Sequence, residues 1–82
     1  MMYENLNEKV NDKMYSICEY SGNVGGTVFY LETLEEAMAY AKKLERDARN
    51  NIDIVISEEQ WDETFKAYEP LDPIEIIEVR GW

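Results

Sequence analysis

The sequence predicts an α+β fold, a two-layer sandwich in which a four-stranded mixed sheet carries two helices on one face. Three observations lead to this prediction. One long segment has the apolar spacing of an amphipathic helix, a second segment has helix start and stop signals, and four short segments are rich in β-branched and aromatic residues. In chain order they give β-β-α-β-α-β. The chain is predicted to be a single acidic domain over residues 1–82, with residues 1–12 as a short helix or an ordered arm.

The longest predicted element is a helix over residues 33–50. Thr33 and Glu36 have the spacing of a capping box, and the acidic-to-basic order of charges along the segment suits the helix dipole. Asn50 and Asn51 can adopt the left-handed conformation that closes a helix, so the helix is predicted to end there. Its apolar residues recur at the spacing of one buried face. They are Leu34, Ala37, Met38, Ala41, Leu44 and Ala48.

A β-hairpin is predicted before this helix, with strands over residues 14–20 and 27–31. Between them lie Gly22, Gly25 and Gly26, which tolerate unusual backbone angles, so we expect a hairpin loop longer than two residues. Three glycines exceed what a simple turn needs. A loop that contacts a ligand is therefore the alternative interpretation of this segment.

After the long helix, a strand over residues 52–56, a second helix over residues 58–67 and a last strand over residues 74–79 are predicted. Ser57 and Gln60 give the second helix a capping box, and two prolines end it. Its carboxylates would cover the side opposite a narrow aromatic stripe, which is predicted to be buried. The stripe consists of Trp61, Phe65 and Tyr68.

The composition excludes most kinds of catalytic site. Without histidine there is no Ser-His or Cys-His pair, and a single cysteine excludes an internal disulfide and the usual zinc sites. No phosphate-binding or dinucleotide-binding glycine motif is present. We therefore predict a non-enzymatic protein without cofactor or metal, and an enzyme that uses carboxylates alone is the remaining alternative. Cys18 lies in a predicted strand and is expected to be a buried, inert thiol, because a reactive thiol needs a cationic or helix-N-terminal neighbour.

The net charge of −10 is the most unusual property of the chain. It works against direct binding of nucleic acid or anionic lipid, and it suits a partner with a basic surface. Solubility alone would also be a sufficient reason for it. The acids concentrate in residues 50–82, which carry nine acids and two bases. The predicted partner-binding residues lie on the second helix and the loop after it: Glu58, Glu59, Asp62, Glu63, Glu69 and Asp72.

Carboxylates on a rigid scaffold can imitate the phosphates of a nucleic acid and occupy a basic groove. In size, charge and lack of catalytic residues the chain is similar to small acidic phage proteins that block host nucleases or CRISPR effectors. This similarity is one of composition and covers no motif. The leading hypothesis is an acidic interaction protein, with a DNA mimic that inhibits a nucleic-acid-binding protein as its specific form.

The alternative hypothesis is an accessory domain that binds a protein or forms a homodimer, with its acidity incidental. Its contacts would then come from the hairpin around residues 22–26, from an open sheet face or from Trp82. Either form would be a monomer or a homodimer. No apolar segment is long enough to span a membrane and the first residues do not resemble a signal peptide, so a cytoplasmic location is expected.

Overall fold

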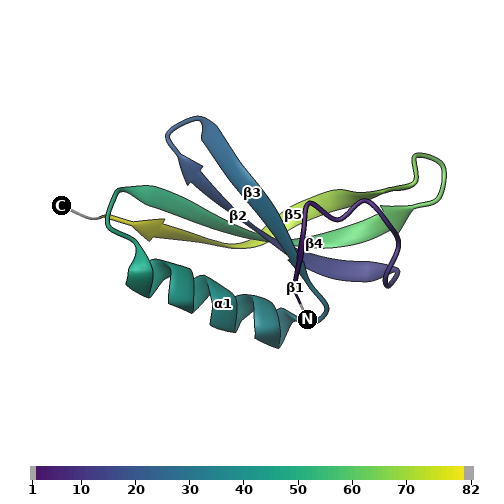
Figure 1. Ribbon diagram of the computed structural model, residues 1–82, viewed down its shortest axis with the longest axis horizontal. Helices are drawn as coiled ribbons and strands as arrows, with labels where there is room; N and C mark the ends of the chain where they lie inside the picture. Colours follow the sequence, from purple (N-terminus) through teal and green to yellow (C-terminus); the bar gives the residue numbers. More distant parts are fainter. Residues whose placement is uncertain (1, 81–82) are drawn as a thin grey trace.

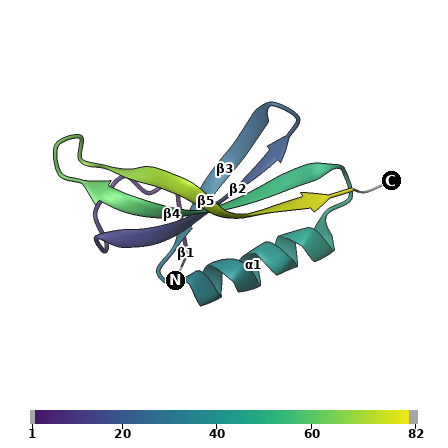
Figure 2. The same ribbon diagram turned by 180° about the vertical axis from the view of Figure 1, so that it is seen from behind.

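The computed structural model describes residues 2–80, and this part of the chain forms five strands and one helix (Figures 1 and 2). The elements are β1 (Met2–Glu4), β2 (Lys13–Ser21), β3 (Val24–Leu31), α1 (Leu34–Asp47), β4 (Ile52–Asp62) and β5 (Ala67–Val79). All strands belong to one antiparallel sheet with the order β1-β3-β2-β4-β5. The chain is α+β, but the predicted architecture is wrong: the sheet has five strands instead of four, it is antiparallel instead of mixed, and it carries one helix instead of two.

Helix α1 lies along one face of the sheet, and the opposite face carries no helix (Figures 1 and 2). It packs on β2, β3 and β4, so β5 lies at the margin of the covered area. Ala37 and Ala41 are completely buried, and their small side chains let the helix backbone approach the sheet closely. The buried core consists of Ile17, Leu31, Ala37, Ala41, Ile54 and Ile56.

The start of α1 agrees with the prediction, and its end does not. The Thr33 hydroxyl oxygen accepts a hydrogen bond from the backbone N–H of Glu36 (3.1 Å), as a helix cap does. The helix ends at Asp47, and Ala48 is already extended, with φ −67° and ψ 141°. The guanidinium of Arg49 donates to the backbone carbonyls of Asp47 and Ala48 (3.1 and 3.2 Å). An arginine side chain therefore satisfies carbonyls at this end, where a left-handed asparagine was expected.

The β2–β3 hairpin has a two-residue turn, so the expected longer loop is wrong. Gly22 takes φ +67° in this turn, while Gly25 and Gly26 lie inside β3. Gly25 faces Tyr20 across the hairpin, and a Cβ atom at this position would lie 3.0 Å from the Tyr20 ring. This glycine therefore makes room for the aromatic ring, which is a structural use.

The predicted second helix over residues 58–67 is absent. β4 instead continues through this segment to Asp62, and β5 begins at Ala67. The Asp62 carboxylate accepts hydrogen bonds from the backbone N–H groups of Thr64 and Phe65 (2.8 and 3.1 Å), and Lys66 takes φ +54°. These contacts close a four-residue hairpin turn.

The aromatic stripe of that helix is divided by the hairpin. Trp61 and Tyr68 pair across the two strands, with ring centroids 5.0 Å apart in an edge-to-face arrangement. Phe65 lies at the hairpin tip with 72% of its surface exposed, so its predicted burial is wrong. Ser57 is a buried strand residue and caps no helix.

The N-terminal segment is an ordered arm and not a short helix. β1 pairs with β3, and the loop that follows reaches the helix-free side of the sheet. There the Tyr68 hydroxyl accepts hydrogen bonds from the backbone N–H groups of Val10 (2.9 Å) and Asn11 (3.2 Å) and donates one to the Asn11 carbonyl (2.7 Å). Trp82 lies outside the described residues. Within residues 2–80, the one helix is too short and too polar to cross a membrane.

Candidate interaction surface

The six acids predicted to bind a partner do not share one face. Strand residues alternate between the two sides of a sheet, so Glu58 and Glu59 point in opposite directions. Glu58 lies on the helix side and pairs with Lys13, with 2.7 Å between the carboxylate oxygen and Nζ. Glu59 lies on the helix-free side and is 4% exposed.

The acids at the hairpin tip are largely matched by other groups. The Glu63 carboxylate pairs with Lys66 (3.0 Å) and Lys9 (3.3 Å), and these hydrogen bonds lower its pKa. Asp62 holds the turn. Among residues 2–80, Glu69 and Asp72 are the exposed members of the predicted set that make no ion pair and hold no turn, and the buried Glu59 makes no ion pair either. The acidic helix face is therefore not formed, and binding by these residues individually stays a prediction.

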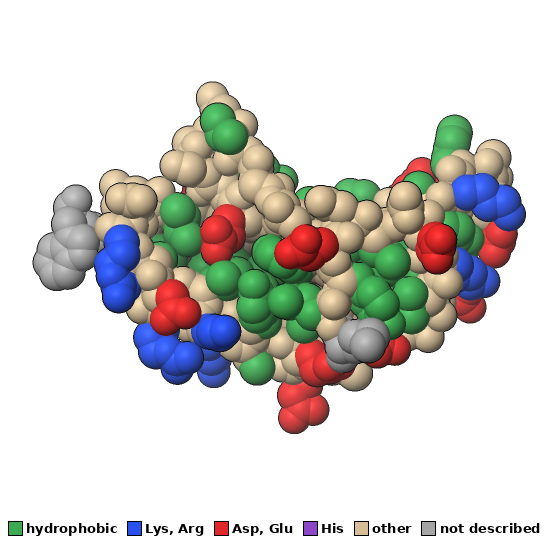
Figure 3. Space-filling model, in the orientation of Figure 1, with side chains coloured by type: hydrophobic (Ala, Val, Ile, Leu, Met, Phe, Trp, Pro, Cys, Tyr) green, Lys and Arg blue, Asp and Glu red, His purple; other side chains and the backbone are tan. Residues whose placement is uncertain are grey.

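Charge on the surface is distributed unevenly. In the orientation of Figure 1, Lys and Arg side chains gather at the two ends of the visible face (Figure 3). Strand β5, by contrast, contains four acids and no base: Glu69, Asp72, Glu75 and Glu78. Glu78 pairs with Arg80 (3.3 Å), which follows the strand. The side of the molecule formed by β5 is therefore acidic.

Strand β5 presents an unpaired backbone edge. Within residues 2–80 it pairs only with β4, so alternate N–H and C=O groups on its other side face outward. Pro70 and Pro73 lack an N–H, and the pairing with β4 is irregular beside them, which blunts the first half of this edge. Residues 74–79 contain no proline and no lysine, and residues 75–79 pair with β4 without a register shift. This second half of the edge can accept another strand.

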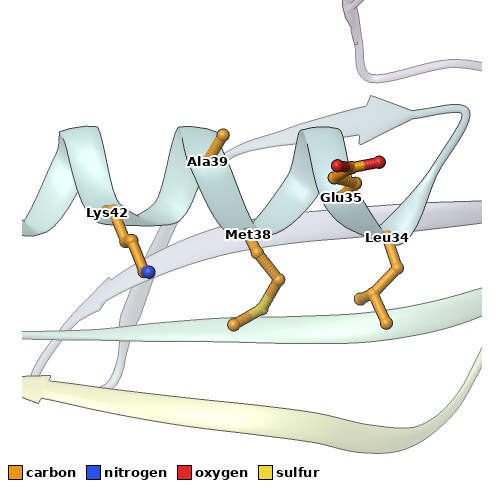
Figure 4. A pocket seen from close by; sticks show the side chains of 5 residues that line it. All are labelled: Leu34, Glu35, Met38, Ala39 and Lys42. Atoms are coloured by element: carbon orange, nitrogen blue, oxygen red, sulfur yellow. The ribbon is translucent and has the colours of Figure 1, made fainter.

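Exposed apolar side chains accompany this edge. Ile76 is 55% exposed, and Leu71 and Ile74 are 46% and 43% exposed. On the helix side of the sheet, a hollow of about 520 Å³ is lined by α1 residues that include Leu34 and Met38. Figure 4 shows both side chains pointing from α1 toward β4 and β5. A strand added to β5 would therefore find apolar side chains on the sheet and on the flank of the helix.

Cys18 lies on the helix-free side, and its predicted burial is confirmed. Its sulfur is 3.8 Å from the Glu19 carbonyl oxygen and 3.9 Å from that of Gly26, which are weak contacts. Inertness of the thiol stays a prediction.

Comparison with known proteins found no family model, no curated protein and no solved structure that matches this chain. Within residues 2–80, no group of three or more Cys, Asp or Glu side chains is arranged to hold a metal ion. The candidate surface is therefore defined by its geometry and charge.

Sequence reasoning missed both the β5 edge and the burial of Glu59. One signal was present: the alternation that begins at Ile52 continues to Trp61 and places Asp53, Val55 and Ser57 on the same side as Glu59. A second signal was the aspartate before the turn, since Asp side chains bond the backbone two residues further on. Read together, they predict a long hairpin and not a helix.

Proposed function

We propose that this chain is a small interaction protein that binds an extended, basic segment of a partner protein as an additional strand along β5. The observation that carries the proposal is the unpaired edge of residues 74–79, with Ile76 exposed on the helix-free side of the sheet and the hollow along α1 on the other side. In such strand addition, main-chain hydrogen bonds supply affinity and side-chain pockets supply specificity.

Charge favours a basic partner over a second copy of the chain. The chain carries −10, and β5 contains four acids without a base. Antiparallel pairing of two β5 strands would bring these acids together, and like charges on neighbouring strands are destabilising. A partner segment with Lys or Arg would relieve the same repulsion and associate faster at low salt.

The more specific predictions made from the sequence, on the kind of partner, the location and the lack of enzymatic activity, are part of this proposal. Inhibition of a nucleic-acid-binding protein is its specific form, in which the bound segment would be part of that protein's basic surface. A cytoplasmic setting and the absence of enzymatic activity are proposed with it. The Gly22–Gly26 hairpin is less favoured as the contact surface, because Gly22 shapes the turn and Gly25 accommodates Tyr20.

A peptide titration followed by NMR tests the proposal. The probe is an eight-residue peptide with alternating lysine and valine, and its counterpart has glutamate in place of lysine. We expect the basic peptide to shift the backbone amides of residues 74–79 and the methyl groups of Leu34 and Met38, and the acidic peptide to shift none of them. Raising the salt concentration should weaken the complex steeply.

Two variants make this experiment decisive. Ile76→Lys places a positive charge on the edge and removes an exposed apolar contact, so it should weaken binding of the basic peptide at least tenfold. Val24→Lys is the matched control, because Val24 is 72% exposed at the far end of β3. Equal binding by both variants, or peptide-induced shifts on another surface, would contradict strand addition at β5. Dimers in sedimentation equilibrium that Ile76→Lys dissociates would identify a second copy as the occupant.

A further inference from the structure

The helix-free face of the sheet contains a groove of about 180 Å³. In the view of Figure 1 this face is turned upward, away from α1, and Figure 3 shows the molecule hollowed between its two raised ends. Four neighbouring strands contribute to its lining. The residues that matter for its chemistry are Ser16, Cys18 and Tyr20 from β2, Tyr30 from β3, Glu59 from β4 and Tyr68 from β5.

Glu59 is a buried carboxyl group without a cationic partner. Its Oε2 accepts a hydrogen bond from the Ser16 hydroxyl (2.8 Å), which is itself buried. Among residues 2–80, no Lys or Arg nitrogen lies within ion-pair distance of this carboxyl, and Ser16 is the only hydrogen-bond donor to it. Removal from water raises the pKa of Glu59, since burial disfavours the charged form. Buried carboxylates are normally paired with a cation. The described residues supply no such counter-ion to Glu59.

The walls of the groove are aromatic. The rings of Tyr30 and Tyr68 lie 5.7 Å apart, measured between centroids. The Tyr68 hydroxyl is occupied by the N-terminal arm, so it is the ring that Tyr68 offers to the groove. Tyr30 and Glu59 line the same groove, and burial, followed by the negative charge of Glu59, raises the pKa of the Tyr30 phenol. Tyrosine faces attract cations.

We propose that this groove binds a primary ammonium group on an aliphatic chain, with Glu59 as its counter-ion and the tyrosine rings around its alkyl part. The volume of about 180 Å³ is below the range of pockets for drug-sized ligands, and it suits a ligand the size of one side chain. A lysine side chain of a protein and a free alkylamine share this chemistry. The inference goes beyond strand addition at β5 and does not rest on it.

Binding should be linked to the protonation of Glu59. The other titratable groups that line the groove are the thiol of Cys18 and the phenols of Tyr20, Tyr30 and Tyr68. Glu59 is the carboxyl group in this lining, and burial raises its pKa. An ammonium ion favours the ionised carboxylate, so affinity should rise with pH as Glu59 loses its proton, and binding should release that proton.

An NMR titration with butylammonium chloride tests this site. We expect the side-chain carboxyl signal of Glu59 to shift, and its titration midpoint to fall by about one pH unit at saturating butylammonium. Butanol, which has the same chain without the charge, should bind at least tenfold more weakly at pH 7. Nα-acetyl-lysine amide separates the two sources: binding at least as tight as that of butylammonium indicates a protein lysine, and weaker binding indicates a free amine.

Variants of the carboxyl groups provide the controls. Glu59→Gln keeps the shape and an acceptor for Ser16, and it should weaken butylammonium binding at least tenfold. Glu63→Gln removes an equally negative but exposed group and should leave the affinity unchanged. If Glu59→Gln does not fold, two other measurements test the proposal. They are the affinity of Tyr30→Leu for butylammonium and the titration midpoint of the Glu59 carboxyl signal in the unmodified protein. An unmoved midpoint, equal binding of butanol, or full affinity in Glu59→Gln or Tyr30→Leu would overturn the proposal.

Discussion

The hydroxyl group of Tyr68 connects the N-terminal arm to the sheet, and its removal gives the sharpest test of the fold. Tyr68 is 8% exposed, and its hydroxyl makes three hydrogen bonds to the backbone of Val10 and Asn11, at 2.7, 2.9 and 3.2 Å. A hydrogen bond contributes roughly 0.5–1.5 kcal/mol net. Water can reach the exposed Asn11 and replace part of this, so Tyr68→Phe should lower the free energy of unfolding by about 2 kcal/mol. In a domain of this size that corresponds to a fall in Tm of about 8–16 °C.

Thermal unfolding followed by circular dichroism measures the change in Tm, and amide hydrogen exchange locates it. The backbone amides of Val10 and Asn11 should lose protection in Tyr68→Phe, while amides in the centre of β2 keep theirs relative to global unfolding. Tyr40→Phe is the control, because the Tyr40 ring packs on Phe29 and its hydroxyl makes no hydrogen bond within residues 2–80. Unchanged protection of both arm amides in Tyr68→Phe would refute the contact between arm and sheet.

Three further predictions test other elements. Because burial raises the Glu59 pKa in the folded state, the folded protein binds this proton more tightly than the unfolded chain, and stability falls as pH rises from about 4.3 through the folded pKa. Glu59→Gln should remove that fall. If urea unfolding shows that the free energy of unfolding changes with pH in the same way in both proteins between pH 4 and 7, the prediction is wrong. Phe65→Ser should change the free energy of unfolding by less than about 0.5 kcal/mol, whereas Trp61→Ser should lower it by about 3 kcal/mol. A helix over this segment would instead make both changes costly. Gly22→Ala should lower the free energy of unfolding by about 1 kcal/mol, because φ is +67° there, and an unchanged urea midpoint would mean that the turn differs.

Elements specified by neighbouring residues were predictable from the sequence. The start of α1 is encoded by Thr33 and Glu36, and its buried face by Ala37 and Ala41, all within three turns of one helix. The β2–β3 pair was predictable for the same reason, since β-branched and aromatic residues flank a glycine-containing turn. The position of the turn was not, because Gly25 is required by the Tyr20 ring and not by the chain reversal.

The second half of the chain depends on partners that are distant in sequence. Residues 58–67 contain good helix formers behind Ser57, so the local preference favours a helix. In the folded protein, Ser57 and Glu59 pair with Ser16 and Met14 on β2, more than 40 residues earlier. Ladder hydrogen bonds and the pairing of Trp61 with the opposite strand outweigh a local preference of a few tenths of a kcal/mol per residue. The predicted acidic helix face is wrong because the helix is not formed. In β4, strand alternation places Glu59 on the buried side of the strand.

The buried pair of Ser16 and Glu59 leads to a last prediction, in which binding and stability oppose each other. A buried carboxyl without a counter-ion is a cost to a domain of this size, and replacing both members of a buried polar pair with apolar groups is often neutral or stabilising. The double variant Ser16→Ala, Glu59→Met keeps most of the volume and leaves no hydroxyl unpaired. We expect it to gain about 1 kcal/mol in urea unfolding at pH 7 and to lose butylammonium binding. A gain in stability with binding lost means that the carboxyl group is kept for a ligand at the expense of the fold. A loss of more than about 1 kcal/mol would show instead that the Ser16–Glu59 hydrogen bond itself holds β2 against β4.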